Sequence, residues 1–331
     1  MRILMISLDK KILDKGSAVA RRMIEYGEKD ELFILIPHHV RQKFDLSPRV
    51  HVQTTGGNKI AQFARLKRIG VQIVKEHRVE QVTTQDPFFS GLAGAWLKNT
   101  FGVQLEVQLH GDFFGSDYYR KSGVMNLIRY QVGKIVVKRA DRVRVVGERI
   151  KENLTKLYKI KGDAIEVRPI AVDADRIRVY IPKMDLHKKY VGFEKIFLAL
   201  GRIEPVKNIA WLVDVFADVV KQKPNCLLLV VGSGSEEDKM RLQVTDDKLQ
   251  KNIQFEGWTD DPWSYLKTAD CLLFPSLAEG YGLVAMEAVA AGRPVIMTDV
   301  GVANYELKPS KTVRIVPVGD REAFIRAMLD L

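Results

Sequence analysis

Short runs of aliphatic residues alternate along the chain with longer amphipathic stretches of helix length. This alternation predicts parallel sheets with helices packed on their faces, and the nearly continuous apolar character of the runs indicates strands buried on both faces. The predicted strands of the first half are residues 2–8, 31–37, 50–55, 80–85, 103–110, 142–146 and 165–170. The pattern then restarts, with predicted strands at 195–202, 226–231, 253–255, 271–274, 294–298 and 313–316.

A polar stretch at residues 180–190 separates the two halves. It contains a proline and has no clean periodicity, so it predicts a linker. A chain of 331 residues is long enough for two domains that each bury a core of their own. We therefore expect an α/β protein with domains at residues 1–185 and 186–331.

The chain carries no apolar run long enough to cross a bilayer, and its first residues read as a buried strand instead of a signal peptide. Its two cysteines, Cys226 and Cys271, lie in predicted strands, where reduced and buried thiols are expected. These features predict a cytoplasmic protein without disulfides.

The formal charge of +11 is concentrated in the first half. Residues 1–185 hold 34 lysines and arginines against 21 aspartates and glutamates, whereas residues 186–331 hold 18 against 20. A basic half suggests an acidic partner: nucleic acid, an anionic membrane or a phosphorylated acceptor. The basic stretches 59–68 and 118–139 read as helices that either lie on an anionic bilayer or form solvated outer faces. Nucleic acid is disfavoured because no recognised binding module accompanies the charge.

The most informative stretch for chemistry runs from residue 274 to 294. A predicted strand ends at Pro275, a glycine-containing loop follows, and a helix opens near Gly282, so that backbone N–H groups can bind an anion or sugar hydroxyls. Glu279 lies in the loop and Glu287 in the helix, where the two carboxylates can serve one ligand. The alternative is a solvated loop glutamate and a helix-surface glutamate.

Two further elements of the second half carry candidate binding groups. Arg202 and Lys207 follow the first predicted strand of this half and can neutralise a diphosphate leaving group, or one of them can pair with Glu204. The turn from Gly232 to Gly234 follows a buried strand, but as a dinucleotide fingerprint it is weak, and a simple tight turn explains it equally well.

The first half offers two candidate elements. His110 ends a predicted strand, where α/β sheets present functional side chains, although a single histidine there is more often structural. The loop around Gly16 lies between the first strand and a helix at 19–26, and its N–H groups can cradle phosphate or acceptor. Asp173 and Asp175 spell the D-x-D pattern that holds a metal in other folds.

The 274–294 segment resembles the E-x7-E motif of the family 4 retaining glycosyltransferases, also called glycosyl transferase group 1, which have the GT-B fold. Glu279 and Glu287 have the family spacing, with Pro-Ser before the motif, Glu-Gly-Tyr-Gly within it and Ala-x-Ala-x-Gly-x-Pro-Val after it. The resemblance runs from Met1 to about Pro317. It implies two Rossmann-like domains whose parallel sheets face each other across a cleft, with the acceptor bound by the first domain and the nucleotide sugar by the second.

The resemblance also implies roles for individual residues. It assigns the diphosphate to Arg202 and Lys207, the ribose to Glu287, and the donor sugar to Glu279 and the loop after it. The remaining expected donor-site residues are Gly280, Tyr281, Gly282, the Gly232 turn, Trp258 near the base, His110 from the first domain, and Gly16, where the family often has a glycine pair. The stretch with Asp173 matches the Gly-Val-Asp segment of the family, so no metal and no cofactor besides the nucleotide sugar are expected.

The implied activity is metal-independent, retaining transfer of a hexose-type sugar from a UDP- or GDP-linked donor. The expected acceptor is a glycan or a polyprenyl- or lipid-linked molecule of the cell envelope, with peripheral contact between the basic first domain and the inner face of the membrane. The alternative is a non-catalytic nucleotide-sugar-binding protein on the same fold, whereas the missing G-x-G-x-x-G disfavours an NAD-dependent dehydrogenase. Family members usually continue with a C-terminal helix that crosses back to the first domain. This sequence ends at Leu331 without it, so domain closure is expected to be impaired.

Overall fold

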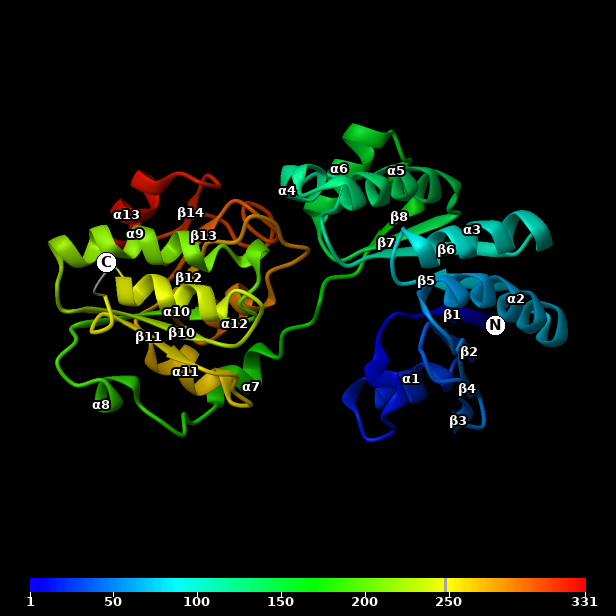
Figure 1. Cartoon of the computed structure of the whole chain (residues 1–331), viewed down its shortest axis with the longest axis horizontal. Coiled ribbons are helices and arrows are strands. Elements are labelled where there is room, and N and C mark those ends of the chain that lie inside the picture. The colour runs from blue at the N-terminus through cyan, green and yellow to red at the C-terminus, as the bar shows by residue number, and fades with distance from the viewer. Residues whose placement is uncertain (247–248) are drawn as a thin grey trace. The chain divides into compact units, whose positions relative to one another are not determined.

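The computed structural model describes residues 1–246 and 249–331 and divides into two compact units, Met1–Arg168 and Pro169–Leu331. Each unit is a sheet with helices on both faces (Figure 1). None of the helices in these described ranges is both long and apolar enough to span a membrane.

The first unit contains an eight-stranded sheet in the order β3-β4-β2-β1-β5-β6-β7-β8. All neighbouring strands pair in parallel except β3 and β4, which are antiparallel. The strands are β1 (Arg2–Ile6), β2 (Glu31–Ile36), β3 (Lys43–Ser47), β4 (Val50–Thr54), β5 (Gln81–Thr84), β6 (Gln104–Leu109), β7 (Arg142–Val145) and β8 (Ile165–Val167). Each strand predicted in this half overlaps one of them, and β3 is an additional edge strand that was not predicted.

Helices cover both faces of this sheet. On one face, α1 (Ala18–Gly27) packs through Met23 into an apolar cluster with β1, β2 and β4. On the other face, α2 (Lys59–His77) and α3 (Phe89–Phe101) lie next to each other, because Gly70 of α2 leaves room for Leu97 of α3. The remaining helical segments are η1 (Lys10–Leu13), α4 (Asp117–Lys121), α5 (Val124–Arg139), α6 (Glu148–Tyr158) and η2 (Gly162–Ala164).

The second unit contains a six-stranded, wholly parallel sheet in the order β11-β10-β9-β12-β13-β14. Its strands are β9 (Lys195–Leu200), β10 (Cys226–Val231), β11 (Ile253–Glu256), β12 (Cys271–Phe274), β13 (Val295–Thr298) and β14 (Val313–Val316). Every residue of β10 is buried, as its uninterrupted apolar sequence predicts. The order places β9 and β12 side by side, so the loops that follow them meet at one edge of the sheet.

Figure 1 shows α9 and α13 on one side of this sheet and α7, α8 and α11 on the other. The described helical segments are α7 (Ala174–Val179), α8 (Leu186–Lys189), η3 (Pro205–Lys207), α9 (Ile209–Gln222), α10 (Glu237–Asp246), α11 (Pro262–Thr268), α12 (Leu283–Ala290) and α13 (Arg321–Leu329). Phe216 of α9 and Phe324 of α13 are fully buried in an apolar cluster with β9 and β10.

The segment from Pro169 to residue 185, which precedes the expected domain boundary, packs on the second unit. The hydroxyl of Tyr180 donates to Asp261 at 2.8 Å, and the backbone N–H of Lys183 donates to Ser264 at 2.8 Å. The ammonium of Lys267 donates to the carbonyl of Tyr180 at 2.8 Å. The boundary between the two compact units therefore lies after Arg168, earlier in the chain than the expected boundary at residue 185.

Candidate functional site

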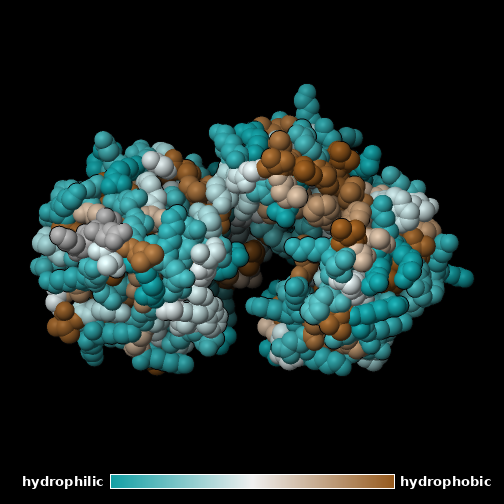
Figure 2. All heavy atoms as spheres, viewed as in Figure 1, coloured by the Kyte–Doolittle hydropathy of each residue, from teal (hydrophilic) through white to brown (hydrophobic). Residues whose placement is uncertain are grey.

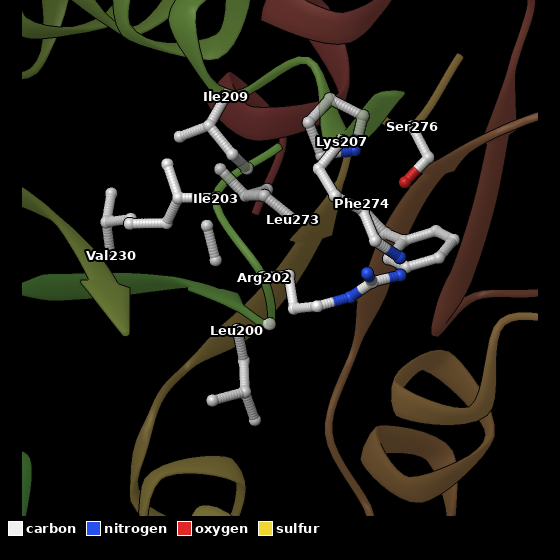
Figure 3. Close-up of a pocket in the computed structure, with 12 residues that line it drawn as sticks. Leu200, Arg202, Ile203, Lys207, Ile209, Val230, Leu273, Phe274 and Ser276 are labelled. Carbon is white, nitrogen blue, oxygen red and sulfur yellow. The ribbon is translucent and has the colours of Figure 1, made fainter. Parts of the chain in front are cut away.

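The loops after β9 and β12 form the candidate site in the second unit. The backbone N–H of Leu277 donates to the carbonyl of Val206 at 2.8 Å and ties the two loops together. A pocket between them is lined by Arg202, Lys207 and Ser276, with Phe274 at its wall. In Figure 3 the side chains of Arg202 and Lys207 both point towards the ring of Phe274.

Lys207 and Glu279 form an ion pair in which both side chains are largely buried. The Ser276 hydroxyl donates to the same Glu279 oxygen at 2.8 Å, and the Lys207 ammonium lies 5.2 Å from the centre of the Phe274 ring. By contrast, the exposed guanidinium of Arg202 has no hydrogen-bond or ion-pair partner in the described part of the chain. The pocket thus combines one paired cation with one cation whose donors are free.

The loop at 279–282 presents backbone donors beside this pair. Within residues 1–246 and 249–331, no acceptor is found for the backbone N–H groups of Glu279, Gly280, Tyr281 and Gly282. Gly282 has a φ of 105° and precedes the first residue of α12 without a side-chain cap. Free N–H groups at a helix N-terminus favour a negatively charged or oxygen-rich ligand.

Tyr281 reaches the site through its backbone alone. Its side chain is buried, and its carbonyl accepts a hydrogen bond from the N–H of Val302 at 2.7 Å. Burial raises the pKa of its phenol, and the charge of Glu306 adds to the increase. The tyrosine ring therefore anchors the loop.

Glu287 lies half-buried on α12 and is not among the residues that line the pocket of Arg202 and Lys207. The indole N–H of Trp263 donates to its carboxylate at 3.4 Å, and burial raises the pKa of this carboxyl. The guanidinium of Arg176 lies 5.4 Å from the Trp263 ring centre. No sequence pattern pointed to Trp263, and Ser276 was noted only as part of the Pro-Ser that flanks the motif.

The Gly232 turn packs directly on the loop that carries Arg202. A Cβ at Gly232, whose φ is 140°, would lie 1.9 Å from the carbonyl oxygen of Gly201, and one at Gly234 would lie 2.2 Å from that of Ile203. The N–H of Ile203 donates to the carbonyl of Ser233 at 2.9 Å. In the structure this turn supports the Arg202 loop through these backbone contacts. Trp258, which follows β11, is 69% exposed.

The predicted residues of the first half lie in the first unit. His110 follows β6 with its ring reaching solvent, and desolvation by the surrounding protein, aided by the charge of Arg144, lowers its pKa. The N–H of Gly16 donates to Asp14 at 2.9 Å within the turn that precedes α1. That donor is therefore occupied inside the protein.

Both aspartates of the D-x-D pattern have partners within the chain. Asp173 caps α7 by accepting from the N–H of Arg176 at 3.1 Å, and Asp175 pairs with Arg178 at 3.0 Å. Across the residues that the structure describes, no three His, Cys, Asp or Glu side chains gather as a metal site would need.

Comparison with solved structures defines the class of fold. Sucrose-phosphate synthase from Thermosynechococcus elongatus superposes with a TM-score of 0.79 at 20% identity, covering 100% of this chain and 89% of that one. The two domains with parallel central sheets are those of the GT-B glycosyltransferases.

Sequence comparison gives the family. The model "Glycosyltransferase Family 4" matches residues 19–176, and the model "Glycosyl transferases group 1" matches residues 186–331. Together they account for nearly all of the chain, which belongs to this family of glycosyltransferases.

Two characterised relatives share long segments with the chain. UDP-Gal:alpha-D-GlcNAc-diphosphoundecaprenol alpha-1,3-galactosyltransferase of Escherichia coli is 26% identical over 78% of this chain and 67% of its own length. Alpha-monoglucosyldiacylglycerol synthase of Streptococcus pneumoniae is 28% identical over 68% of this chain and 53% of its own length. The matched segments thus span from about half to two thirds of these relatives.

Proposed function

We propose that this chain is a retaining, metal-independent glycosyltransferase that moves a hexose-type sugar from a UDP- or GDP-linked donor to a glycan or lipid-linked acceptor. The observation that carries the proposal is the pocket in which Lys207, paired with Glu279, lies with the free guanidinium of Arg202 beside the free N–H groups of the 279–282 loop. Cations and sugar-binding groups at one sheet edge suit a ligand that has phosphate at one end and hydroxyl groups at the other.

In the proposed reaction, the bond between the sugar carbon and the β-phosphate oxygen breaks and sends negative charge onto that phosphate. Arg202 and Lys207 would stabilise this charge more in the transition state than in the ground state. The acceptor hydroxyl forms the new bond on the same face, and its proton goes to the departing phosphate oxygen, so no covalent protein intermediate is formed and the configuration is retained. This scheme uses no metal ion and no cofactor besides the nucleotide-sugar donor.

The other expected residues complete the donor site in this proposal. Glu279 and the 279–282 amides would bind the sugar hydroxyls, and Glu287 would accept hydrogen bonds from the ribose. His110 would contact the sugar, and desolvation by the surrounding protein, aided by the charge of Arg144, lowers its pKa and so favours the neutral imidazole. The loop of Gly16, the remaining expected donor-site residue, would bind phosphate or the acceptor.

Turnover tests this proposal against a non-catalytic binding protein. With a panel of UDP- and GDP-sugars, we expect release of nucleoside diphosphate from at least one donor, and Glu279→Gln should lower kcat/KM about 10- to 100-fold, because a charged hydrogen-bond acceptor is replaced by a neutral amide. The control is Glu322→Gln, at an exposed glutamate of α13, which should behave as wild type. Saturable donor binding without any turnover would support the binding protein instead.

We also propose that the first unit contacts an anionic membrane through α5. Its residues Val124, Met125, Leu127, Ile128 and Ile135 are all between 46% and 76% exposed. Figure 2 shows hydrophobic atoms gathered over α5 and the neighbouring part of α3. The basic side chains of α5 are Arg129, Lys134, Lys138 and Arg139, and apolar residues flanked by cations suit the surface of an anionic bilayer. This contact would place the chain at the membrane surface, where a lipid-linked acceptor lies.

Vesicle binding tests the membrane proposal. Leu127→Asp/Ile128→Asp should weaken binding to phosphatidylglycerol vesicles by more than tenfold, because it removes two apolar side chains and adds two negative charges. Leu242→Asp, at a residue of the second unit that is 68% exposed, should leave binding unchanged. Equal binding to phosphatidylcholine vesicles, or an unaffected double variant, would contradict the proposal.

A further inference from the structure

A second cavity, of about 200 Å³, lies in the first unit between β2, β3 and β4 and the C-terminal half of α2. Its apolar lining comes from Phe33, Ile34, Val52 and Ile73, and the other residues that line it are polar. None of the residues assigned to sugar transfer lines it. The cavity is therefore separate from the site described above.

One end of the cavity is basic. Arg41 and Lys43 line it from the strand side, together with Gln53, which is the cross-strand partner of Lys43. In the described parts of the chain, none of these three side chains has a hydrogen-bond or ion-pair partner. Two free cations and a free amide N–H group directed at one space favour an anion, and the fork of arginine donors matches phosphate oxygens.

The other end of the cavity carries two imidazoles, a carboxylate and an amide, which include both donors and acceptors of hydrogen bonds. Phe33 is stacked between two imidazoles, with ring centres 5.1 Å from His51 and 4.2 Å from His77. His51 is occupied by Asp45 at 2.7 Å, whereas no described residue bonds to the ring nitrogens of His77. Glu76 also lies here and accepts from Gln72 at 2.9 Å.

The two ends lie apart because α2 runs back along the sheet after β4. Residues 72–77 of the helix therefore lie near the start of β2 and β4, whereas Lys43 pairs with Gln53 towards the end of β4. The C-terminal half-charge of α2 and the carboxylate of Glu76 disfavour an anion at the helix end, while two full positive charges favour one at the strand end. A ligand with phosphate at one end and hydroxyl groups at the other fits the basic strand end and the helix end of the cavity together.

We propose that this cavity is a second binding site, which takes the phosphate monoester of a small polyol. Arg41, Lys43 and Gln53 bind the phosphate, and His77 and Glu76 bind the hydroxyl groups. Its volume lies below the roughly 300–1,000 Å³ of sites for larger ligands, which limits the polyol to a few carbon atoms. The same chemistry occurs in a soluble polyol phosphate and in the headgroup of a lipid phosphomonoester.

Calorimetric titration of the full chain with glycerol phosphate tests the soluble source. We expect saturable binding that weakens at least tenfold in Arg41→Gln/Lys43→Gln. The control Arg22→Gln/Lys29→Gln removes the same charge from exposed positions of the same unit and should bind as wild type. Thermal unfolding of each variant checks that the unit remains folded.

Vesicles test the lipid source. If the ligand is a lipid headgroup, phosphatidic acid vesicles should bind more tightly than phosphatidylglycerol vesicles of equal charge density, and the double variant should lose this preference while the control keeps it. Binding of either probe that depends on Arg41 and Lys43 supports the site. Absence of binding to both probes, or equal losses in the two double variants, would overturn it.

Discussion

Replacing Lys207 with alanine is expected to lower kcat by about 100- to 1,000-fold, the loss found when one group that stabilises transition-state charge is removed. The ammonium lines the pocket with Arg202 and is held by Glu279, so its position is fixed before a ligand arrives. Charge on the leaving phosphate develops during the reaction, so KM for the donor should change much less than kcat. Steady-state kinetics with the best donor of the panel measures both values.

Two substitutions serve as controls for Lys207→Ala. Lys207→Arg keeps the charge but not the compact shape and should recover part of the activity. Lys221→Ala, at an exposed lysine of α9, should leave kcat unchanged. A Lys207→Ala protein with wild-type kcat would remove this residue from the proposed mechanism.

Gly232→Ala is expected to destabilise the second unit by about 3 kcal/mol or more and to lower turnover as well. The new Cβ would lie 1.9 Å from the carbonyl oxygen of Gly201, so the loop that carries Arg202 has to move. The φ of 140° adds its own cost, of about 1–3 kcal/mol. Urea unfolding monitored by circular dichroism gives the change in free energy of unfolding.

Gly192→Ala separates the two causes. Gly192 also has a positive φ, of 94°, but no atom lies within 4 Å of a Cβ placed there. This variant should therefore lose only the conformational part, about 1 kcal/mol, and keep full turnover. Equal losses of unfolding free energy in the two variants would show that the contact with Gly201 adds nothing to the cost of Gly232→Ala.

The sequence predicted the sheets well because their strands are buried. An apolar run such as Cys226–Val231 is typical of the interior of a parallel sheet. The edge strand β3 escaped prediction because its five residues alternate between exposed and half-buried positions and pair with β4 alone. The folding of residues 169–185 onto the second unit also escaped prediction, since it depends on single contacts such as that of Tyr180 with Asp261.

Arg202, Lys207 and Glu279, which the structure brings to one sheet edge, were predicted from the sequence, but the contacts among them were not. Lys207 and Glu279 are 72 residues apart, and they meet only because β9 and β12 are neighbours in the sheet. The hydrogen bond between Trp263 and Glu287 joins α11 to α12, and no sequence pattern predicts it. Spacing and residue type identify candidates, whereas the order of strands decides which of them touch.

The ion pair between Lys207 and Glu279 has a consequence for how the enzyme would choose among ligands. Lys207 and Glu279 are already partners of each other, so a bare anion that attracts Lys207 must leave Glu279 without its counter-charge, in a largely buried position. In the proposed reaction an intact donor would avoid this loss, because its sugar hydroxyls would bind the carboxylate while its phosphates bind the lysine. After transfer of the sugar, the glutamate would compete again for the lysine, which would weaken binding of the nucleoside diphosphate and favour its exchange for a new donor.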